Sequence, residues 1–150
     1  MSVYGDKAEA LFRQGFNCSQ SVLCAFGDLT GLDGETAAKL ASSFGGGLGR
    51  MREVCGAVSG ACMVLGLLRG YSDPKDAAAK REHYHLIQEY AHRFRAQNGS
   101  IICRELLNGA GTEGTEPEAR TEQYYKKRPC PALVREAAEL VATLLELGEA

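Results

Sequence analysis

The apolar positions of this chain recur at the three- and four-residue spacing of α-helices, and no segment alternates between apolar and polar residues as a half-buried strand would. Segment 6–14, for example, places Ala8, Leu11 and Phe12 on one side of a helix. The last helix carries its apolar residues in a single stripe, which consists of Leu133, Ala137, Leu140, Leu144 and Leu147. The pattern predicts an all-α fold, a compact helical bundle of about six to seven helices with one Gly-rich loop, in a single domain over residues 1–150.

Polar residues at helix ends set the expected boundaries in the first part of the chain. Asn17 and Gln20 are spaced as a capping box, which opens a helix that runs to about Phe26. Asp33 is placed to cap a third helix over 34–43. In both cases a side-chain acceptor satisfies N–H groups of the first helical turn, which have no partner within the helix.

The same signals set the boundaries in the second half. Asp73 is predicted to cap the longest helix, with Pro74 at its first position, and the Asn-Gly pair at 98–99 ends that helix. Ser100 is predicted to cap a short helix that follows. Cys130 precedes a proline and is therefore predicted to occupy the cap position of the last helix.

Two segments between the helices are predicted to be loops. Residues 44–52 (FGGGLGRMR) hold four glycines in five positions, which permits positive φ and close backbone approach but not a helix interior. Residues 108–122 (NGAGTEGTEPEARTE) are rich in Gly, Thr and Glu and are predicted to be a mobile surface loop. Directly after the glycine loop, segment 54–68 is apolar on all sides, which predicts a central helix whose small residues let neighbours pack close to its backbone.

Composition narrows the classes of function. Hydrophobic residues make up 45% of the chain and charged residues 24%, and the formal net charge of -2 gives no basic excess that would point to nucleic acid. The longest uncharged apolar run, 54–68, is shorter than the ~18 residues of a membrane span, which predicts no membrane insertion. The N-terminal sequence lacks the basic-then-apolar order of a signal peptide, so we expect a cytoplasmic protein.

Six cysteines in a chain expected in a reducing compartment point to metal binding or redox chemistry rather than to structural disulfides. Four of them fall at predicted helix starts, namely Cys18, Cys55, Cys103 and Cys130. The N–H groups and the positive dipole end of a helix stabilise a thiolate and lower its pKa. We therefore expect these four cysteines to converge on one site, although they are far apart in sequence.

The other two cysteines, Cys24 and Cys62, lie inside apolar helical runs and are predicted to be core residues. Cys62 follows Cys55 by seven residues on the same helix face, so it is also a candidate for the deeper wall of the same site. The familiar metal spacings are missing, because the chain has no C-x-x-C, no C-x-x-C-H and no ferredoxin pattern. Spacing alone therefore does not identify what the four cysteines bind.

The sequence around these cysteines resembles a known family, the redox-active proteins named for their C_GCAxxG_C_C cysteine pattern. The matching motifs cover nearly the whole chain and comprise 15–18 (GFNC), 44–50 (FGGGLGR), 55–60 (CGAVSG), 103–109 (CRELLNG) and Cys130. The family's four cysteines fall on the four positions that helix starts select. The family is also similar to the cluster-bearing part of split-Soret cytochromes, which implies iron–sulfur binding and electron transfer by analogy. The haem-attachment part of those cytochromes has no counterpart in this chain.

Three functions stay open at this point. The first is a small redox protein that binds an iron–sulfur cluster of unknown type and exchanges electrons with an unidentified redox protein partner; its metal ligands would be Cys18, Cys55, Cys103 and Cys130. The loop around the cluster would offer N–H groups to it, and its residues would be Gly45, Gly46, Gly47, Gly49, Arg50 and Gly56. The second is a thiol–disulfide protein with no cofactor. The third is a helical transport-accessory or interaction module with a structural metal.

Three further features of the sequence point to no particular function. The glycine loop lacks both the Gly-Lys-Ser/Thr ending and the preceding strand of a phosphate-binding loop. The histidines at 83, 85 and 92 are predicted to be surface residues. The basic residues 126–128 either meet an acidic redox partner or belong to a solvated loop. The sequence leaves open whether the bundle is a monomer or a homodimer, and whether it is an enzyme.

Overall fold

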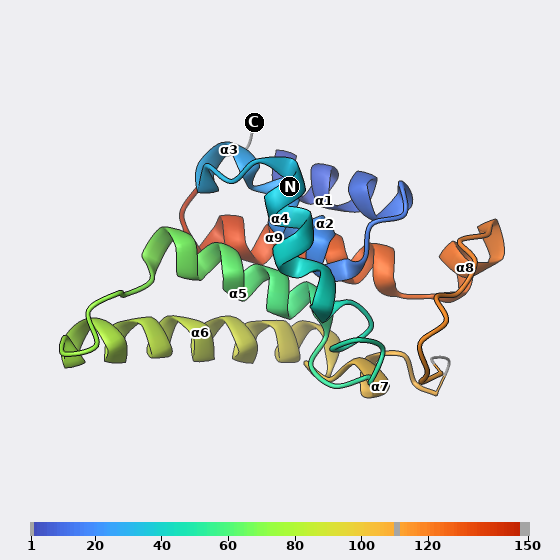
Figure 1. Ribbon diagram of the computed structural model, residues 1–150. Coiled ribbons are helices and arrows are strands. Elements are labelled where there is room, and N and C mark those ends of the chain that lie inside the picture. Colours follow the sequence, from blue (N-terminus) through green and yellow to red (C-terminus); the bar gives the residue numbers. More distant parts are fainter. Residues whose placement is uncertain (1, 110–111, 148–150) are drawn as a thin grey trace.

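The computed structural model of this chain describes residues 2–109 and 112–147. In these residues the chain is all-α, as predicted, and extended pairing is limited to an isolated bridge between Val54 and Ile102. The helices, including the short 3-10 helix η1, are in chain order α1 (Val3–Arg13), α2 (Cys18–Ala25), α3 (Gly27–Thr30), α4 (Gly34–Ala41), η1 (Ser42–Phe44), α5 (Gly56–Arg69), α6 (Ala77–Asn98), α7 (Cys103–Leu106), α8 (Glu122–Lys127) and α9 (Cys130–Leu144). Figure 1 shows α5 and α6 side by side, with α6 along one edge of the bundle.

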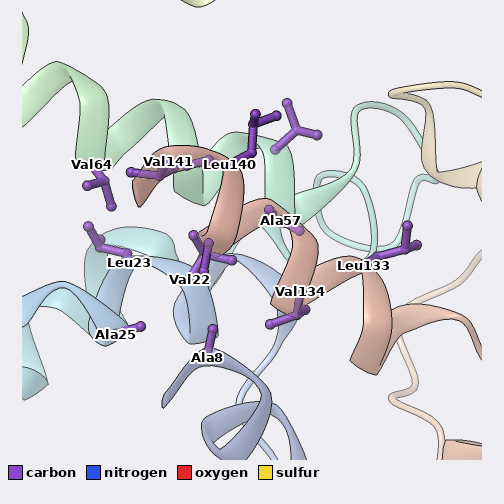
Figure 2. Packing of buried hydrophobic residues seen from close by; sticks show 14 of the residues in the cluster. Ala8, Val22, Leu23, Ala25, Ala57, Val64, Leu133, Val134, Leu140 and Val141 are labelled. Carbon is purple, nitrogen blue, oxygen red and sulfur yellow. The ribbon is translucent and has the colours of Figure 1, made fainter. Parts of the chain in front are cut away.

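Helix α2 lies at the centre of the core. It contains no charged residue, so it can be buried on most sides, and it packs against α1, α4, α5 and α9. Its Val22 and Leu23 are fully buried. Figure 2 shows Leu23 pointing toward Val64 of α5, with Val22, Ala8 of α1 and Val134 of α9 gathered beside them. The short helix that carries Cys18 at its start is therefore held from several sides.

Helix α6 covers α5 and α9 with one narrow face. Tyr90 and Phe94 are its fully buried side chains, and the Tyr90 hydroxyl donates to the carbonyl of Ala137 at 2.9 Å. Most other positions of this helix are polar or charged. No helix in the described residues is both long and apolar enough to cross a membrane.

The longest helix begins later than Asp73 and Pro74 predict. Asp76 is its cap, because its carboxylate accepts a hydrogen bond from the N–H of Ala79 at 3.0 Å. The carboxylate of Asp73 instead accepts from the N–H of Lys75 at 2.9 Å and makes a turn. Asp73 and Asp76 are both residues that can cap a helix, and the helix begins after Asp76.

Two further helix starts differ from the prediction by one or two residues. The Ser100 hydroxyl accepts from the N–H two positions later at 2.9 Å, so it makes a turn, and α7 begins at Cys103. Cys130 is the first residue of α9 rather than its cap, because the N–H of Leu133 donates to the carbonyl of Pro129 at 2.9 Å. Both corrections place a cysteine in the first position of a helix.

The polar segment predicted as one loop over 108–122 ends in a helix. The Thr121 hydroxyl accepts from the N–H of Tyr124 at 3.1 Å and caps α8. With six residues, α8 is too short to show a helical period in the sequence. Residues 110–111 of this segment lie outside the described residues.

Two glycines of α5 let α2 approach its backbone, as predicted for a helix of small residues. A Cβ at Gly60 would lie 2.6 Å from the carbonyl oxygen of Ser19, and a Cβ at Gly56 would lie 3.3 Å from the Cβ of Cys18. The two glycines are four residues apart and so share one helix face. The glycines of the CGAVSG motif are therefore packing residues that bring the starts of α2 and α5 together.

Alanine at Gly60 tests this close contact. We expect Gly60→Ala to lower the free energy of unfolding by about 1–3 kcal/mol, because the added methyl group overpacks the helix crossing. Gly66→Ala is the matched control in the same helix, since a Cβ there meets no atom within 4 Å. The better helix propensity of alanine should raise stability at that site by about 0.5–1 kcal/mol. Urea unfolding measures both variants, and equal effects would contradict the contact.

Candidate redox site

The four cysteines at helix starts line one cavity. Cys18, Cys103 and Cys130 are the first residues of α2, α7 and α9, and Cys55 is the N-cap of α5. The cavity has a volume of about 420 Å³. The starts of four helices, where N–H groups lack partners within the helix, therefore meet at the same space.

Cys18 is positioned by the turn that precedes it. The Asn17 side chain accepts from the N–H of Gln20 at 2.9 Å, and the Gln20 side chain accepts from the N–H of Asn17 at 3.0 Å, which completes the predicted capping box. Asn17 Nδ2 also donates to the carbonyl of Ser42 at 3.2 Å, just before the glycine loop. The side chain of Cys18 lies against Gly56, at the start of α5.

Cys55 and Cys103 are brought together by backbone pairing. The N–H of Cys55 donates to the carbonyl of Ile101 at 2.8 Å, and the N–H of Cys103 donates to the carbonyl of Glu53 at 2.6 Å. Both hydrogen bonds flank the isolated bridge between Val54 and Ile102. The pairing joins the end of the glycine loop to the start of α7, so both thiols reach the cavity.

The side chains of Cys18 and Cys130 form a hydrogen-bonded pair. The Cys18 thiol donates to the Cys130 sulfur, and this bond lowers the pKa of Cys130. Burial opposes the decrease, while the guanidinium groups of Arg128, Arg120 and Arg52 reinforce it. The same hydrogen bond, together with burial, raises the pKa of Cys18 well above its usual range. Cys130 is therefore the cavity cysteine that ionises most readily.

Burial raises the pKa of the other two cavity thiols. The pKa of Cys55 rises to about 12 by burial, although the N–H groups of Ala57 and Val58 at the start of α5 oppose the rise. Burial also raises the pKa of Cys103, against the hydrogen bond that Arg52 Nη1 donates to its sulfur at 3.7 Å. A thiolate at either position therefore requires a compensating positive charge.

The glycine loop follows a left-handed path. Residues 46–50 all have positive φ, from 54° to 72°, although Leu48 and Arg50 are not glycines. The N–H groups of 48–53 donate to carbonyl groups of 43–48, which stabilises this path. These N–H groups therefore already have hydrogen-bond acceptors within the loop. Of the residues predicted to surround a cluster, Gly49 and Arg50 thus have N–H groups that already donate within the loop.

The loop residues predicted to surround a cluster all line the cavity. Gly47 shows why a side chain is excluded there, because its φ is 72° and a Cβ would lie 2.7 Å from the Cβ of Cys103. The cavity-lining residues of this set are Gly45, Gly46, Gly47, Gly49, Arg50 and Gly56. The glycines thus supply space and backbone shape at the site.

Residues 112–121, which we call the strap, close one side of the cavity. Arg50 donates to the carbonyl of Gly114 at 2.9 Å and to that of Thr112 at 3.2 Å, and Arg52 Nε donates to the carbonyl of Thr112 at 3.0 Å. The strap residues that line the cavity are Thr115, Pro117, Glu118 and Arg120. The segment predicted as a surface loop is thus tied to the glycine loop by charge-assisted hydrogen bonds.

Three guanidinium groups converge on Glu118, the one carboxylate among the described residues that line the cavity. Arg50 Nη2 lies 3.6 Å and Arg52 Nη2 lies 3.8 Å from Glu118 Oε1. Arg128 Nη2 pairs with the same oxygen. Glu118 is not among the residues predicted for the site. Arg128 was predicted to lie in a basic surface patch, whereas the Arg128 side chain is only 5% exposed.

Arg120 is a fourth cation of the site and fixes the strap to α1. It donates to the carbonyl of Phe12 at 2.8 Å and to that of Phe16 at 3.1 Å. Its guanidinium carbon lies 4.2 Å from the centre of the Phe12 ring and 5.1 Å from that of Tyr124. Phe12 and Tyr124 also line the cavity, which gives it an apolar wall beside the charged one.

The other candidate ligands lie elsewhere. Cys24 and Cys62 are half-buried, pack against the core, and are not among the described residues that line the cavity. Burial raises the pKa of both thiols, that of Cys62 to about 11. Cys62 therefore does not form a deeper wall of the site. Within the described residues the cavity lining also includes no histidine.

The described residues contain no group of three or more Cys, His, Asp or Glu side chains arranged to hold a single metal ion. Four sulfurs bound to one ion at about 2.3 Å would lie within about 4 Å of one another. In a polynuclear iron–sulfur cluster the thiolates bind different irons and so stand around a larger group.

Residues 16–144 match the family described as "Putative redox-active protein (C_GCAxxG_C_C)". The match covers most of the chain and includes all four cavity cysteines, so the chain belongs to this family. The resemblance predicted from the sequence motifs is confirmed, and with it the general class of redox-active protein that uses cysteines. No curated protein and no solved structure matches the chain.

The Cys18–Cys130 pair predicts an order of thiol reactivity in the reduced, metal-free protein. Because its pKa is lowered, Cys130 forms a thiolate at lower pH than the other cavity cysteines. Of these four thiols it should therefore be alkylated first at about pH 7. Cys18→Ala removes the hydrogen-bond donor, so the pH profile of Cys130 alkylation should move to higher pH. Iodoacetamide labelling with mass spectrometry measures this, with Cys24→Ala as the control. An unchanged Cys130 profile in Cys18→Ala would disprove the pair.

Proposed function

We propose that this chain is an electron-transfer protein that holds an iron–sulfur cluster through Cys18, Cys55, Cys103 and Cys130. The observation that carries the proposal is that these four side chains, from four helix starts, line one cavity. Cysteine thiolates are the ligands that hold most iron–sulfur clusters. Such a cluster, when bound, supplies reversible one-electron reduction.

The charges around the cavity support an anionic occupant. A cluster held by four thiolates is an anion, and a buried anion requires compensating positive groups. Arg52 contacts the Cys103 sulfur, and Arg120 and Arg128 lower the pKa of Cys130. These guanidinium groups would stabilise bound thiolates in the same way that they favour the ionised Cys130.

The donor arrangement favours a cluster over the structural metal of the third hypothesis. A structural zinc site is tetrahedral and closed, with its ligands gathered around one ion. The described residues contain no group of that kind. The four cysteines instead share, with other residues, the lining of a cavity of about 420 Å³.

The glycine loop is the place where a redox partner would reach the site. Its inner side lines the cavity, and the exposed fractions of Leu48, Met51 and Val54 are 44%, 51% and 38%. Exposed apolar side chains at this density are typical of contact surfaces. A cytoplasmic location suits this activity, because all six cysteines are free and a reducing compartment keeps them so.

A second candidate function rests on the hydrogen bond between Cys18 and Cys130. In a thiol–disulfide protein this pair would reduce a disulfide substrate. The Cys130 thiolate would attack one sulfur of the substrate and release the other as a thiolate. The Cys18 thiolate would then attack the Cys130 sulfur of the mixed disulfide and release the second substrate sulfur as a thiolate, which leaves a Cys18–Cys130 disulfide and the substrate as two thiols.

Alanine variants of all six cysteines separate these functions. After anaerobic purification, Cys18→Ala, Cys55→Ala, Cys103→Ala and Cys130→Ala should each lose most of the iron and visible absorbance of the wild type, because each removes a ligand. Cys24→Ala and Cys62→Ala are the matched controls and should keep both, with only a modest packing loss. Visible spectra and iron content per folded chain measure the effect.

Two outcomes would count against the cluster. A variant of Cys24 or Cys62 as colourless as Cys55→Ala would overturn the division of the cysteines into two classes. A colourless wild type that forms a Cys18–Cys130 disulfide on oxidation would favour the second candidate.

A further inference from the structure

Three arginines beside the strap share one carboxylate oxygen, in addition to the interactions of Arg52 and Arg128 with the cavity cysteines. Arg50, Arg52 and Arg128 come from two separate segments and meet at a single oxygen, Oε1 of Glu118. The side chains of Arg52 and Arg128 are 9% and 5% exposed, so both guanidinium groups are more than nine-tenths buried. Buried polar groups convergent on one point are the construction of a binding site.

The charges at this point do not balance. Three guanidinium groups carry three positive charges and meet one carboxylate, that of Glu118, while Arg52 and Arg128 also act on the sulfurs of Cys103 and Cys130. Like charges that share one oxygen repel each other, and burial leaves this repulsion poorly screened by water. A ligand with more negative charge than a carboxylate would therefore bind the three arginines better than Glu118 does.

We propose that Arg50, Arg52 and Arg128 form a binding site for a small oxyanion with two negative charges, in which Glu118 is the tethered occupant. A tetrahedral dianion presents several oxygens, so the three guanidinium groups need not share one atom. Glu118, in contrast, meets all three arginines through one atom. Its side chain is 36% exposed, so the carboxylate can turn toward solvent as the anion enters.

Arg52 places this oxyanion site next to the cysteines. One of its guanidinium nitrogens lies 3.8 Å from Glu118 Oε1, and another donates to the Cys103 sulfur at 3.7 Å. An oxyanion in the position of the Glu118 carboxylate thus lies one guanidinium group away from a cavity sulfur. The binding itself depends only on the arginines, whereas its position beside a redox centre rests on the proposed function.

Titration calorimetry with inorganic sulfate and inorganic phosphate tests the site, at an ionic strength held constant with sodium chloride. Glu118→Gln removes the competing charge and should bind either dianion about tenfold tighter than the wild type. Glu116→Gln is the matched control, because it removes an exposed carboxylate of the same strap, and it should bind as the wild type does. Adding Arg52→Gln to Glu118→Gln should abolish the gain.

Glu118→Asp keeps the negative charge on the strap and should bind sulfate no more tightly than the wild type. Equally tighter sulfate binding in Glu118→Asp and Glu118→Gln, or no tighter binding in a folded Glu118→Gln, would overturn the oxyanion site.

Thermal unfolding is a second test. In the wild type, phosphate should raise the melting temperature above that in chloride of equal ionic strength, and it should not do so in Arg52→Gln. An equal rise in both proteins would also overturn the proposal. Failure of the proposed function would appear separately, as the absence of iron from these preparations.

Discussion

The close crossing of α2 and α5 is the contact on which the site depends. A Cβ at Gly60 would lie 2.6 Å from the carbonyl oxygen of Ser19, so glycine lets the two helices meet backbone to backbone. This crossing sets Cys18, at the start of α2, beside Cys55, at the start of α5. Because α2 also packs against α9, the same short helix brings in Cys130, whose sulfur accepts the Cys18 hydrogen bond. The site is thus a consequence of how the core packs.

Charge compensation is the second constraint, because sulfur in a buried cavity ionises only where positive groups stand near it. The pKa values of the cavity cysteines follow this balance. Burial raises the pKa of Cys55 to about 12, whereas the hydrogen bond from Cys18 and the neighbouring guanidinium groups lower the pKa of Cys130. Arg52 serves both parts of the site, since it contacts the Cys103 sulfur and the Glu118 carboxylate. The cysteines and the strap are therefore electrostatically one unit.

The all-α fold and the grouping of the four cysteines follow from local signals, namely helical periodicity and the residues that open helices. The predicted starts at Asp73 and Ser100 were wrong because a side chain that makes a turn and one that caps a helix look alike in sequence. The strap was missed for a different reason. Its Glu118 lies in a segment with the composition of a solvated loop, and two of its three partners, Arg50 and Arg52, lie far away in the sequence. Such contacts exist only once the core has brought these segments together.

Iron and inorganic sulfide analysis of the protein, purified under strictly anaerobic conditions, tests the central claim most directly. Iron and acid-labile sulfide should accompany the folded chain in comparable amounts, and the four cavity thiols should become available to alkylation only after a chelator removes the iron. A folded, fully reduced protein that neither contains nor takes up iron and sulfide, and whose Cys130 is alkylated without any chelator, would contradict cluster binding.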